Sequence, residues 1–373
     1  MIRAADSLLP RAGTLEGVPA HRLCVAPMME RTDRHCRYLL RLVAPRAWLY
    51  TEMITARGLI NGDRARLLRF DAREHPVALQ IGGSEAGELA AAARFGADVG
   101  YDEVNLNVGC PSGRVQAGCF GAALMLDAAR VAECVAAMRE AVPARVPVTV
   151  KTRLGVDDHD SYDFLHGFAA AIVAAGCRTL IVHARKAWLS GLSPKENREI
   201  PLLDYARVHR LKRDFPGVEI VVNGGLTSAA AVRAQLAHVD GVMLGRSAYA
   251  DPMLLADLET VALGGRSDRR SDHRSDFSRD SSDSSELRLK PPLHDYCAYI
   301  EAELRRGTPL KAMTRHLTGL YARTPGARRW RRGLTELADG AAGFRQLCSL
   351  IAAHEDRGCA ARARAATIAH PAF

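Results

Sequence analysis

Eight short apolar segments rich in β-branched residues recur along the chain, and alanine-rich stretches of good helix formers lie between several of them. The segments are 22–28, 47–53, 76–81, 103–108, 147–152, 179–184, 219–222 and 241–244. Near-continuous apolar strands that alternate with helices are typical of a parallel sheet. Eight such units in about 230 residues favour an α/β fold, the closed (β/α)8 TIM barrel, over an open doubly wound sheet, which the count alone leaves open.

The chain has 373 residues, more than the roughly 250 residues that one such barrel needs. After the eighth segment comes a run of Ser, Asp and Arg, in which five Arg balance five Asp and which cannot bury a core. Beyond residue 291 the pattern is helical again. We therefore predict an N-terminal extension at 1–20, a barrel domain at 21–262, a disordered linker at 263–290 and a C-terminal helical domain at 291–373.

The net charge is unevenly distributed along the chain. The whole sequence carries 51 Lys and Arg against 42 Asp and Glu, and residues 288–373 alone carry 15 basic against 7 acidic residues. A basic module of this kind indicates a polyanion such as nucleic acid as a partner, although a solvated basic helical surface would give the same count.

Neither membrane insertion nor metal binding is indicated by the sequence. No stretch approaches the roughly 20 apolar residues of a membrane span, and the first residues lack the apolar region of a secretory signal. The nine cysteines form no Cys-x-x-Cys pair and no cluster with zinc-ligand spacing. We therefore expect a cytoplasmic protein with reduced thiols, no bound metal and no membrane contact.

The loops after the last two segments are rich in glycine. Asn223, Gly224 and Gly225 follow the seventh segment, and Gly245 and Arg246 follow the eighth. In TIM barrels these two loops commonly hold a ligand phosphate, because glycine lets backbone N–H groups approach an anion closely. The pattern favours a phosphate site, with ordinary turn chemistry as the alternative.

Polar side chains end three of the other segments. Placing the charge of Lys151 at a barrel mouth costs free energy unless the lysine faces an anion, and the N1/C2=O edge of a reduced flavin is a suitable one. Gln80 could hydrogen-bond the same ring, or its amide could be hydrogen-bonded within a loop of the protein. Cys110 stands in a Gly-Cys-Pro-Ser turn. A cysteine thiol is ordinarily protonated at neutral pH, so Cys110 could give away a proton, or act as a nucleophile if a base such as His183 were adjacent.

The motifs at these positions resemble the A subfamily of the tRNA-dihydrouridine synthases. The resemblance runs from about residue 21 to 256 and rests on APMMERTDRHCRYLLR, HPVALQIGG, NLNVGCPSGRVQAGCFGAALM, VTVKTRLGVDDHDSY, HARKAWLSGLSPKENREIPLLDY, NGG and DGVMLGRSAY. Further along, MTRHLTGLYARTPGARRWRRGL is similar to the helical RNA-binding domain of that family.

The resemblance implies an FMN enzyme that reduces uridine at positions 20 and 20a of the tRNA D loop, with NADPH as the reductant. It implies that hydride goes to C6 of uracil, that Cys110 protonates C5, and that His183 contacts the flavin nucleotide rather than serving as a base. Residues implied to hold the cofactor are Pro27, Met28, Met29, Gln80, Lys151, His183, Asn223, Gly224, Gly225, Gly245 and Arg246. Residues implied to face the uridine or the rest of the tRNA are Asn107, Lys195, Arg198, Arg328 and Arg331.

The chain departs from the family pattern in the first loop, where Glu30 and Arg31 replace the usual Asp-Trp. Two other functions compete with the one implied. One is a flavin barrel that acts on a free pyrimidine, like dihydroorotate dehydrogenase, but such an enzyme has no evident need for the basic helical domain. The other is a non-catalytic tRNA-binding protein, but such a protein has no need for intact cofactor and acid positions. We therefore expect tRNA and NADPH as partners and no stable protein partner.

Overall fold

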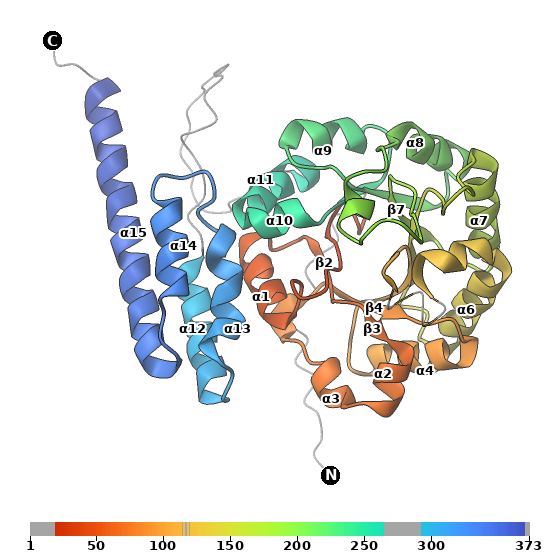
Figure 1. The fold of residues 1–373 in the computed structure, drawn as a ribbon, viewed down its shortest axis with the longest axis horizontal. Coiled ribbons are helices and arrows are strands. Elements are labelled where there is room, and N and C mark those ends of the chain that lie inside the picture. The colour runs from red at the N-terminus through yellow and green to blue at the C-terminus, as the bar shows by residue number, and fades with distance from the viewer. Residues whose placement is uncertain (1–18, 114, 116–117, 119, 265–291, 370–373) are drawn as a thin grey trace, which may run out of the picture.

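Each of the eight predicted segments overlaps one strand of a closed parallel barrel (Figure 1). The computed structural model describes residues 19–113, 115, 118, 120–264 and 292–369, with side chains up to residue 355. The barrel strands are β1 (Leu23–Val25), β2 (Trp48–Tyr50), β4 (Val77–Gly82), β5 (Glu103–Val108), β6 (Val148–Arg153), β7 (Thr179–His183), β8 (Glu219–Asn223) and β9 (Gly241–Leu244). Because β1 pairs with both β2 and β9, and β2 pairs with β4, the sheet closes on itself.

One short strand was not predicted. β3 (Ile54–Thr55) follows β2 and pairs with the end of β4, where Ile54 lies opposite Ile81. Two residues are too few to show a periodic pattern in the sequence, so only the pairing reveals this strand.

Helices surround the barrel and alternate with its strands, as predicted (Figure 1). They are α1 (Arg34–Val43), α2 (Ala56–Asn61), α3 (Arg64–Leu67), α4 (Ala86–Asp98), α6 (Ala128–Ala141), α7 (Tyr162–Ala174), α8 (Tyr205–Asp214), α9 (Ala229–Leu236), α10 (Arg246–Ala250) and α11 (Pro252–Leu263), with the 3-10 turns η1 (Ala72–Glu74), η2 (Gly121–Leu126) and η3 (Glu196–Arg198). Several helices begin at a side-chain cap: Asp33, Ser161 and Ser228 each accept a backbone N–H of the first turn. The carboxyl ends of all barrel strands therefore meet at one mouth.

The barrel interior contains both apolar and polar side chains. Its apolar part consists of Cys24, Ala26, Tyr50, Ala78, Ile181, Val221 and Met243. Its polar part includes Gln80, Glu103, Asn105, Asn107 and Thr149, all buried. Polar groups are tolerated in such a place only when they are hydrogen-bonded, and these are bonded to one another.

The helices after residue 291 form a second unit, here called the helical unit, which lies beside α1 (Figure 1). It consists of α12 (Leu293–Arg305), α13 (Leu310–Thr314), η4 (Arg315–Gly319), α14 (Ala327–Thr335) and α15 (Gly340–Ala369), so the expectation of C-terminal helices is confirmed. Its core is shared with the barrel domain, because Tyr38 and Leu39 of α1 and Met253 of α11 are buried in the same cluster as Tyr299 and Trp330. The predicted extension at 1–20 and linker at 263–290 lie almost entirely outside the described residues.

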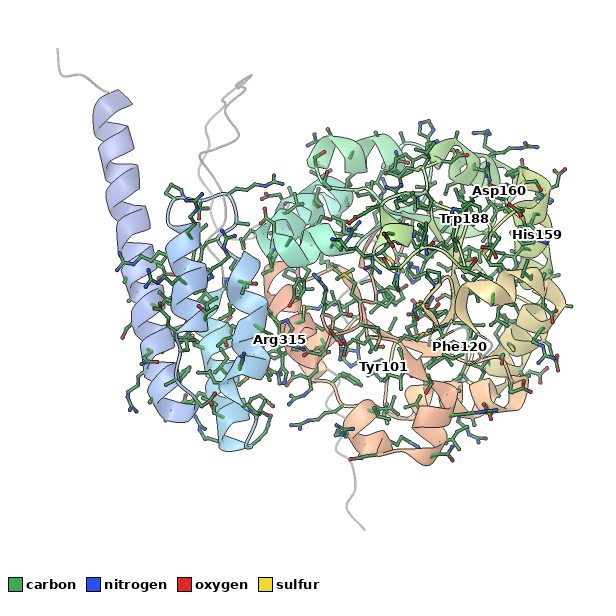
Figure 2. All side chains as sticks on the ribbon, viewed as in Figure 1. Tyr101, Phe120, His159, Asp160, Trp188 and Arg315 are labelled. Atoms are coloured by element: carbon green, nitrogen blue, oxygen red, sulfur yellow. The ribbon has the colours of Figure 1, made fainter. Side chains whose placement is uncertain are left out.

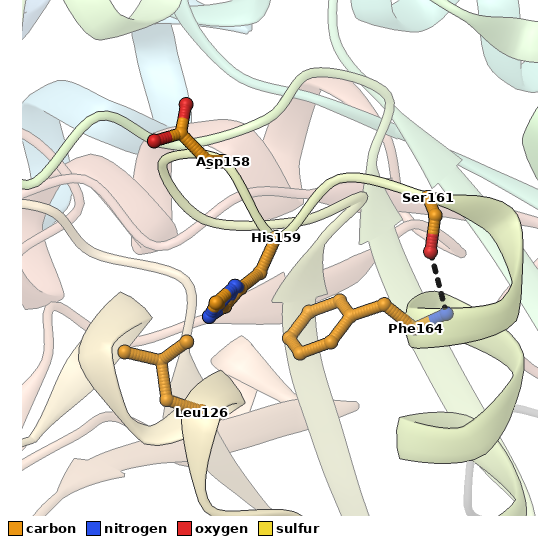
Figure 3. Close-up of a pocket in the computed structure, with 5 residues that line it drawn as sticks. All are labelled: Leu126, Asp158, His159, Ser161 and Phe164. Atoms are coloured by element: carbon orange, nitrogen blue, oxygen red, sulfur yellow. Dashed lines mark hydrogen bonds between the residues drawn. The ribbon is translucent and has the colours of Figure 1, made fainter.

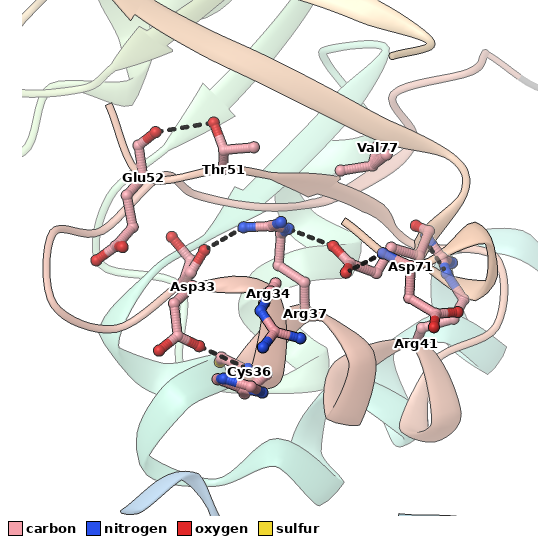
Figure 4. Close-up of polar contacts among 12 residues, drawn as sticks. Asp33, Arg34, Cys36, Arg37, Arg41, Thr51, Glu52, Asp71 and Val77 are labelled. Carbon is pink, nitrogen blue, oxygen red and sulfur yellow. Dashed lines mark hydrogen bonds and ion pairs between the residues drawn. The ribbon is translucent and has the colours of Figure 1, made fainter. Parts of the chain in front are cut away.

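Ion pairs join the helical unit to the first turn of α1. The Asp33 carboxylate caps α1 by accepting from Cys36 N at 2.9 Å (Figure 4), and it also pairs with Arg315, which lies where the two units meet (Figure 2). Arg34 of the same turn pairs with Glu303 of α12. Although burial acts against it, hydrogen bonds from His316 and Arg315 hold the pKa of Asp33 well below its usual range, and Arg34 does the same for the pKa of Glu303.

Two buried arginines attach α1 to the barrel. Arg37, labelled in Figure 4, has its Nε 2.7 Å from a carboxylate oxygen of Glu74. Arg41 Nη2 donates to the carbonyls of Glu74 and Pro76 at 3.0 and 2.9 Å. α1 is thus attached to both units at once.

None of the helices in the described ranges combines the length and the apolar character needed to cross a lipid bilayer.

Candidate active site

Cys110 lies on the loop that leaves β5 at the barrel mouth, where the sequence places it. The side-chain oxygen of Asn107 accepts from the backbone N–H of Gly109 at 3.1 Å and of Cys110 at 3.0 Å, so the last turn of the strand holds this loop. Cys110 is half-buried, and its thiol donates to the Ser112 hydroxyl at 3.5 Å. The backbone of this cysteine is thus fixed by Asn107 at the mouth.

Lys151 lies two residues before the end of the neighbouring strand β6 and has no carboxylate partner among the described residues. Its Nζ donates to the side-chain oxygen of Asn223 at 3.2 Å, and Asn223 in turn donates to the carbonyl of Met243 at 2.7 Å. Burial, together with the nearby guanidinium of Arg153, lowers the pKa of Lys151 to about 7. A half-buried lysine paired only with a neutral amide has the chemistry of a site for an anionic ligand.

His183 ends β7, and its surroundings keep its ring neutral. Burial and the charges of Arg153 and Lys151 lower its pKa well below the usual value. No hydrogen bond joins the His183 ring to Cys110 in the described part of the chain, so the structure does not form the thiol–imidazole pair that a nucleophilic cysteine would use.

The two glycines after β8 occupy positions that favour glycine. Gly224 and Gly225 have φ of 111° and 70°, in the left-handed region. A Cβ on Gly224 would lie 2.6 Å from Cδ2 of His183, and one on Gly225 would lie 2.4 Å from Cδ1 of Leu203. Gly245 differs, because a Cβ there would make only ordinary contacts at 3.7 Å.

Arg246 is already engaged within the protein. Its guanidinium pairs with the Glu199 carboxylate and donates to the carbonyl of Arg198 at 3.3 Å. A phosphate bound in the glycine loop would therefore have to share Arg246 with Glu199. Sequence reasoning could not reveal this competition, because Glu199 lies on a different loop.

Gln80 lies inside the barrel rather than at its rim. Its amide nitrogen donates to Asn105 at 2.8 Å, and its oxygen accepts from Asn107 at 2.9 Å. One N–H of the side chain remains to be offered to a ligand.

The loop after β1 supplies the remaining predicted cofactor residues. Met28 closes a turn by accepting from the backbone N–H of Thr32 at 3.0 Å, Pro27 is half-buried, and the Met29 side chain is 57% exposed. In the same loop the Arg31 guanidinium lies 4.9 Å from the centre of the Tyr249 ring.

Arg153 was not singled out by sequence reasoning, although it stands in the Lys-Thr-Arg triplet at the end of β6. Its side chain is buried and donates to three carbonyls: Gly109 at 3.0 Å, Lys186 at 3.1 Å and Asn197 at 2.8 Å. Gly109 lies on the loop after β5, and Lys186 and Asn197 lie at two places on the long loop after β7. The signal in the sequence was a second cation two positions after Lys151, which needs partners of its own.

The predicted tRNA contacts fall into two groups. Lys195 and Arg198 are exposed at η3, on the long loop after β7, whereas Arg328 and Arg331 are exposed on α14 of the helical unit. The structure thus places one pair beside the mouth and the other on the second unit. A substrate would have to be large to touch both.

A separate pocket of about 560 Å³ lies on the rim, where the loop after β6 approaches η2 (Figure 3). It is lined by Leu126, Asp158, His159, Ser161 and Phe164, none of which was predicted as a site residue.

In the described residues no group of three or more His, Cys, Asp or Glu side chains could hold a metal ion.

The fold is a parallel (β/α)8 barrel, and a half-buried cysteine, a half-buried lysine and several arginines gather at its mouth, where barrel enzymes have their active sites. The chain matches the family described as Dihydrouridine synthase (Dus) over residues 24–355, and it belongs to that family. Enzymes of this family are generally flavin enzymes. The resemblance seen in the sequence motifs is therefore confirmed.

Several curated relatives share about half of their residues with this chain. The tRNA-dihydrouridine(20/20a) synthase of Vibrio cholerae is 51% identical over 318 residues, which are 85% of this chain and 91% of that protein. The protein of the same name from Escherichia coli K12 is 51% identical over 85% of this chain and 86% of its own length. That of Xanthomonas campestris is 53% identical over 84% of this chain and 88% of its own length.

Proposed function

We propose that this chain is a tRNA-dihydrouridine(20/20a) synthase, which reduces the C5=C6 bond of uridine at positions 20 and 20a of the tRNA D loop with FMN as its bound cofactor and NADPH as its reductant. Membership of the family and the names of relatives that cover most of the chain support this proposal.

The observation that carries the proposal is the adjacency of Cys110 and Lys151 at the mouth. In the register of the neighbouring strands β5 and β6, Asn107 lies opposite Lys151, and Cys110 follows Asn107 by three residues. Cys110 and Lys151 therefore lie near the carboxyl ends of these two strands. One supplies a transferable proton, and the other a cation for an anionic ligand.

The residues at the mouth fit FMN by their chemistry. Lys151 and Asn223 would hold the polar edge of the ring, and Gln80 would offer its remaining N–H to it. The loops that contain Gly224, Gly225, Gly245 and Arg246 would bind the phosphate, with His183 beside them and Pro27, Met28 and Met29 along the wall. When bound, FMN would supply the hydride for C6 of uracil after reduction by NADPH.

In this mechanism the protein supplies the proton and the position of the base. Cys110 gives its thiol proton to C5, on a loop held by Asn107. Asn107 has one N–H left, which would face the uridine. His183 is neutral and hydrogen-bonded to no thiol in the described part of the chain, so it does not compete for the proton.

The cations outside the mouth would position the tRNA. Lys195, Arg198, Arg328 and Arg331 would contact phosphates, which fix the register of the RNA without reading its sequence. The target uridine must leave its stack to reach Cys110, and a tRNA loop makes this less costly than a duplex would. We place the reaction in the cytoplasm, and the cysteines that the structure describes are all free thiols.

The test is mass mapping of unmodified tRNA after incubation with the purified protein, FMN and NADPH. We expect a gain of two hydrogens at uridine 20 and at 20a, and the variant Cys110→Ala should keep the flavin and bind tRNA while forming little product. No gain in tRNA, with reduction of a free pyrimidine under the same conditions, would replace the proposal by the competing flavin-barrel function. Normal turnover by Cys110→Ala would overturn the assignment of the proton donor.

A further inference from the structure

A line of hydrogen bonds runs through the barrel interior from the start of β5 to the Cys110 loop. At its start, Thr149 donates to Glu103, and Asn105 Nδ2 donates to Thr149 Oγ1 at 2.7 Å. Gln80 Nε2 then donates to Asn105 Oδ1 at 2.8 Å, and Asn107 Nδ2 donates to Gln80 Oε1 at 2.9 Å. At its end, Asn107 Oδ1 accepts from the backbone nitrogens of Gly109 and Cys110 at 3.1 and 3.0 Å. We call these side chains the relay. Every member of the relay except its last two backbone groups is buried.

The lower end of the relay can only accept hydrogen bonds. The Glu103 carboxyl lies 2.6 Å from Nε2 of His21 and 2.9 Å from the hydroxyl of Tyr50, and Thr149 donates to it as well. The other ring nitrogen of His21 lies 2.7 Å from Glu219, so the ring carries a proton on each nitrogen and faces a carboxylate on each side. Both Glu103 oxygens thus accept hydrogen bonds, Oε1 from Tyr50 and Thr149 and Oε2 from His21.

The upper end of the relay can only donate. The backbone N–H groups of Gly109 and Cys110 have no acceptor to offer, so Asn107 must turn its oxygen toward them. Starting from either end gives the same arrangement, in which each carboxamide oxygen points toward Cys110. Reversing any one amide would set donor against donor or acceptor against acceptor on both of its sides.

We propose that Thr149 and Glu103 are positioning residues for the Cys110 loop, acting through the carboxamides of the relay. Neither touches Cys110, but in a low-dielectric interior the bonds of such a chain strengthen one another. If the Thr149 hydroxyl is lost, the buried N–H of Asn105 loses its acceptor, and the amides above it are held from one end only. The Asn107 oxygen then holds the Cys110 backbone less firmly.

The test compares Thr149→Val, which removes the hydroxyl at nearly constant volume, with Thr149→Ser, which keeps it. In the flavin-loaded protein we expect Thr149→Val to raise amide hydrogen exchange at Gly109 and Cys110, and alkylation of the Cys110 thiol by iodoacetamide, on the order of tenfold. The turnover number should fall by a similar factor while KM for tRNA stays unchanged, because the phosphate contacts are not altered. Thr149→Ser should stay within about twofold of the parent in all of these measurements.

Equal exchange and alkylation in the parent and Thr149→Val would overturn the inference, and so would equal changes in the Val and Ser variants. If Thr149→Val does not fold, Thr149→Ala removes the same hydroxyl without placing a second methyl group against Asn105, and the same result is expected of it. Only the turnover measurement rests on the proposed function. A parent protein that forms no dihydrouridine would refute that function, while the exchange and alkylation results would still decide the role of the relay.

Discussion

The Nε atom of Arg153 donates a hydrogen bond of 3.0 Å to the carbonyl oxygen of Gly109, the residue before Cys110. Nη1 of the same guanidinium donates to the carbonyls of Lys186 and Asn197, so one buried side chain joins the Cys110 loop to two places on the long loop after β7. Burial lowers the pKa of Arg153 only to about 10, so it stays charged at neutral pH. Its partners are carbonyl dipoles, and its charge is left to act on an anionic ligand.

We expect Arg153→Lys to lower the turnover number on the order of tenfold, although the charge is kept. Lysine lacks the planar set of donors that reaches three carbonyls in different directions, so the Cys110 loop would be held less firmly. Steady-state kinetics on tRNA, together with the rate of Cys110 alkylation, measure the effect. Arg213→Lys, an exposed position on α8, is the matched control and should change neither quantity. Wild-type values for both in Arg153→Lys would refute this role.

The stability of the barrel should depend on pH through two groups with opposite signs. Although burial acts against it, Glu103 and Glu219 raise the pKa of His21 from 6.5 to about 10, so its contribution is complete below pH 6.5 and is lost as the pH rises to 10. Burial lowers the pKa of Lys151 from 10.5 to about 7. Between these two values the unfolded chain still binds the proton that the folded chain has released, so the free energy of unfolding rises with pH. In the parent the two slopes oppose each other.

Two substitutions separate these slopes in the flavin-free protein. With Lys151→Met the His21 contribution remains, and the free energy of unfolding should fall by up to about 1.4 kcal/mol per pH unit between pH 7 and 10. With Glu103→Gln the Lys151 contribution remains, and the free energy of unfolding should rise over the same range. Urea unfolding at pH 7, 8 and 9 measures both. Slopes of the same sign in the two variants would contradict the assignment.

The glycine loop after β8 gives a third prediction, which concerns cofactor binding. Gly224→Ala would force a Cβ to within 2.6 Å of the His183 ring at a φ of 111°, so both the ring and the loop must shift. We expect FMN affinity, measured by quenching of flavin fluorescence, to fall by at least about tenfold. Gly217→Ala, on the approach to β8, meets no atom within 4 Å and should leave the affinity unchanged. Equal affinities in the two variants would argue against a cofactor site at this loop.

The exposed arginines of α14 give a fourth prediction, on tRNA affinity. Arg328→Glu combined with Arg331→Glu should weaken binding and reduce the dependence of log Kd on log salt concentration by about one unit per lost phosphate contact. The flavin spectrum should not change, because these residues lie on the helical unit. Arg213→Glu on α8 serves as the control for general charge.

Charge reversal is a sharper test of tRNA binding than deletion of residues 291–373. Deletion would expose Tyr38, Leu39 and Met253, which are buried in the core shared with the helical unit. A fragment damaged in this way could lose tRNA for reasons unrelated to charge. An unchanged salt dependence in the double arginine variant would exclude this face as the tRNA surface.

The strands and their polar ends could be predicted from the sequence, because both depend on local patterns. The apolar segments predicted all eight barrel strands. Because Cys110, Lys151 and His183 lie near or just after the ends of such segments, the sequence also predicted that they lie together at the mouth. The pairing of Arg246 with Glu199 and the three partners of Arg153 could not be predicted. These contacts join loops far apart in sequence, and no periodicity in the chain reports them.

The relay was missed for a related reason. Glu103 and Thr149 occupy the inward positions of strands that read as ordinary apolar segments with an occasional polar residue. Only the closing of the barrel brings His21, Glu103 and Glu219 together at the same end. Gln80 was predicted as a ligand of the cofactor or a satisfied amide, and the structure shows how far the second description holds: two of its hydrogen bonds are made within the protein.

The double attachment of α1 has a consequence for the order in which the chain acquires its structure. The hydrogen bond between His35 of this helix and Tyr299 of α12 spans 264 positions of the sequence. Contacts between such distant partners close slowly, and domains emerge from the ribosome with their N-terminal part first. Tyr38 and Leu39 must therefore wait in contact with water or a chaperone until α12 and α14 have been synthesised. The helices that complete the protein are also those that end the exposure of its first one.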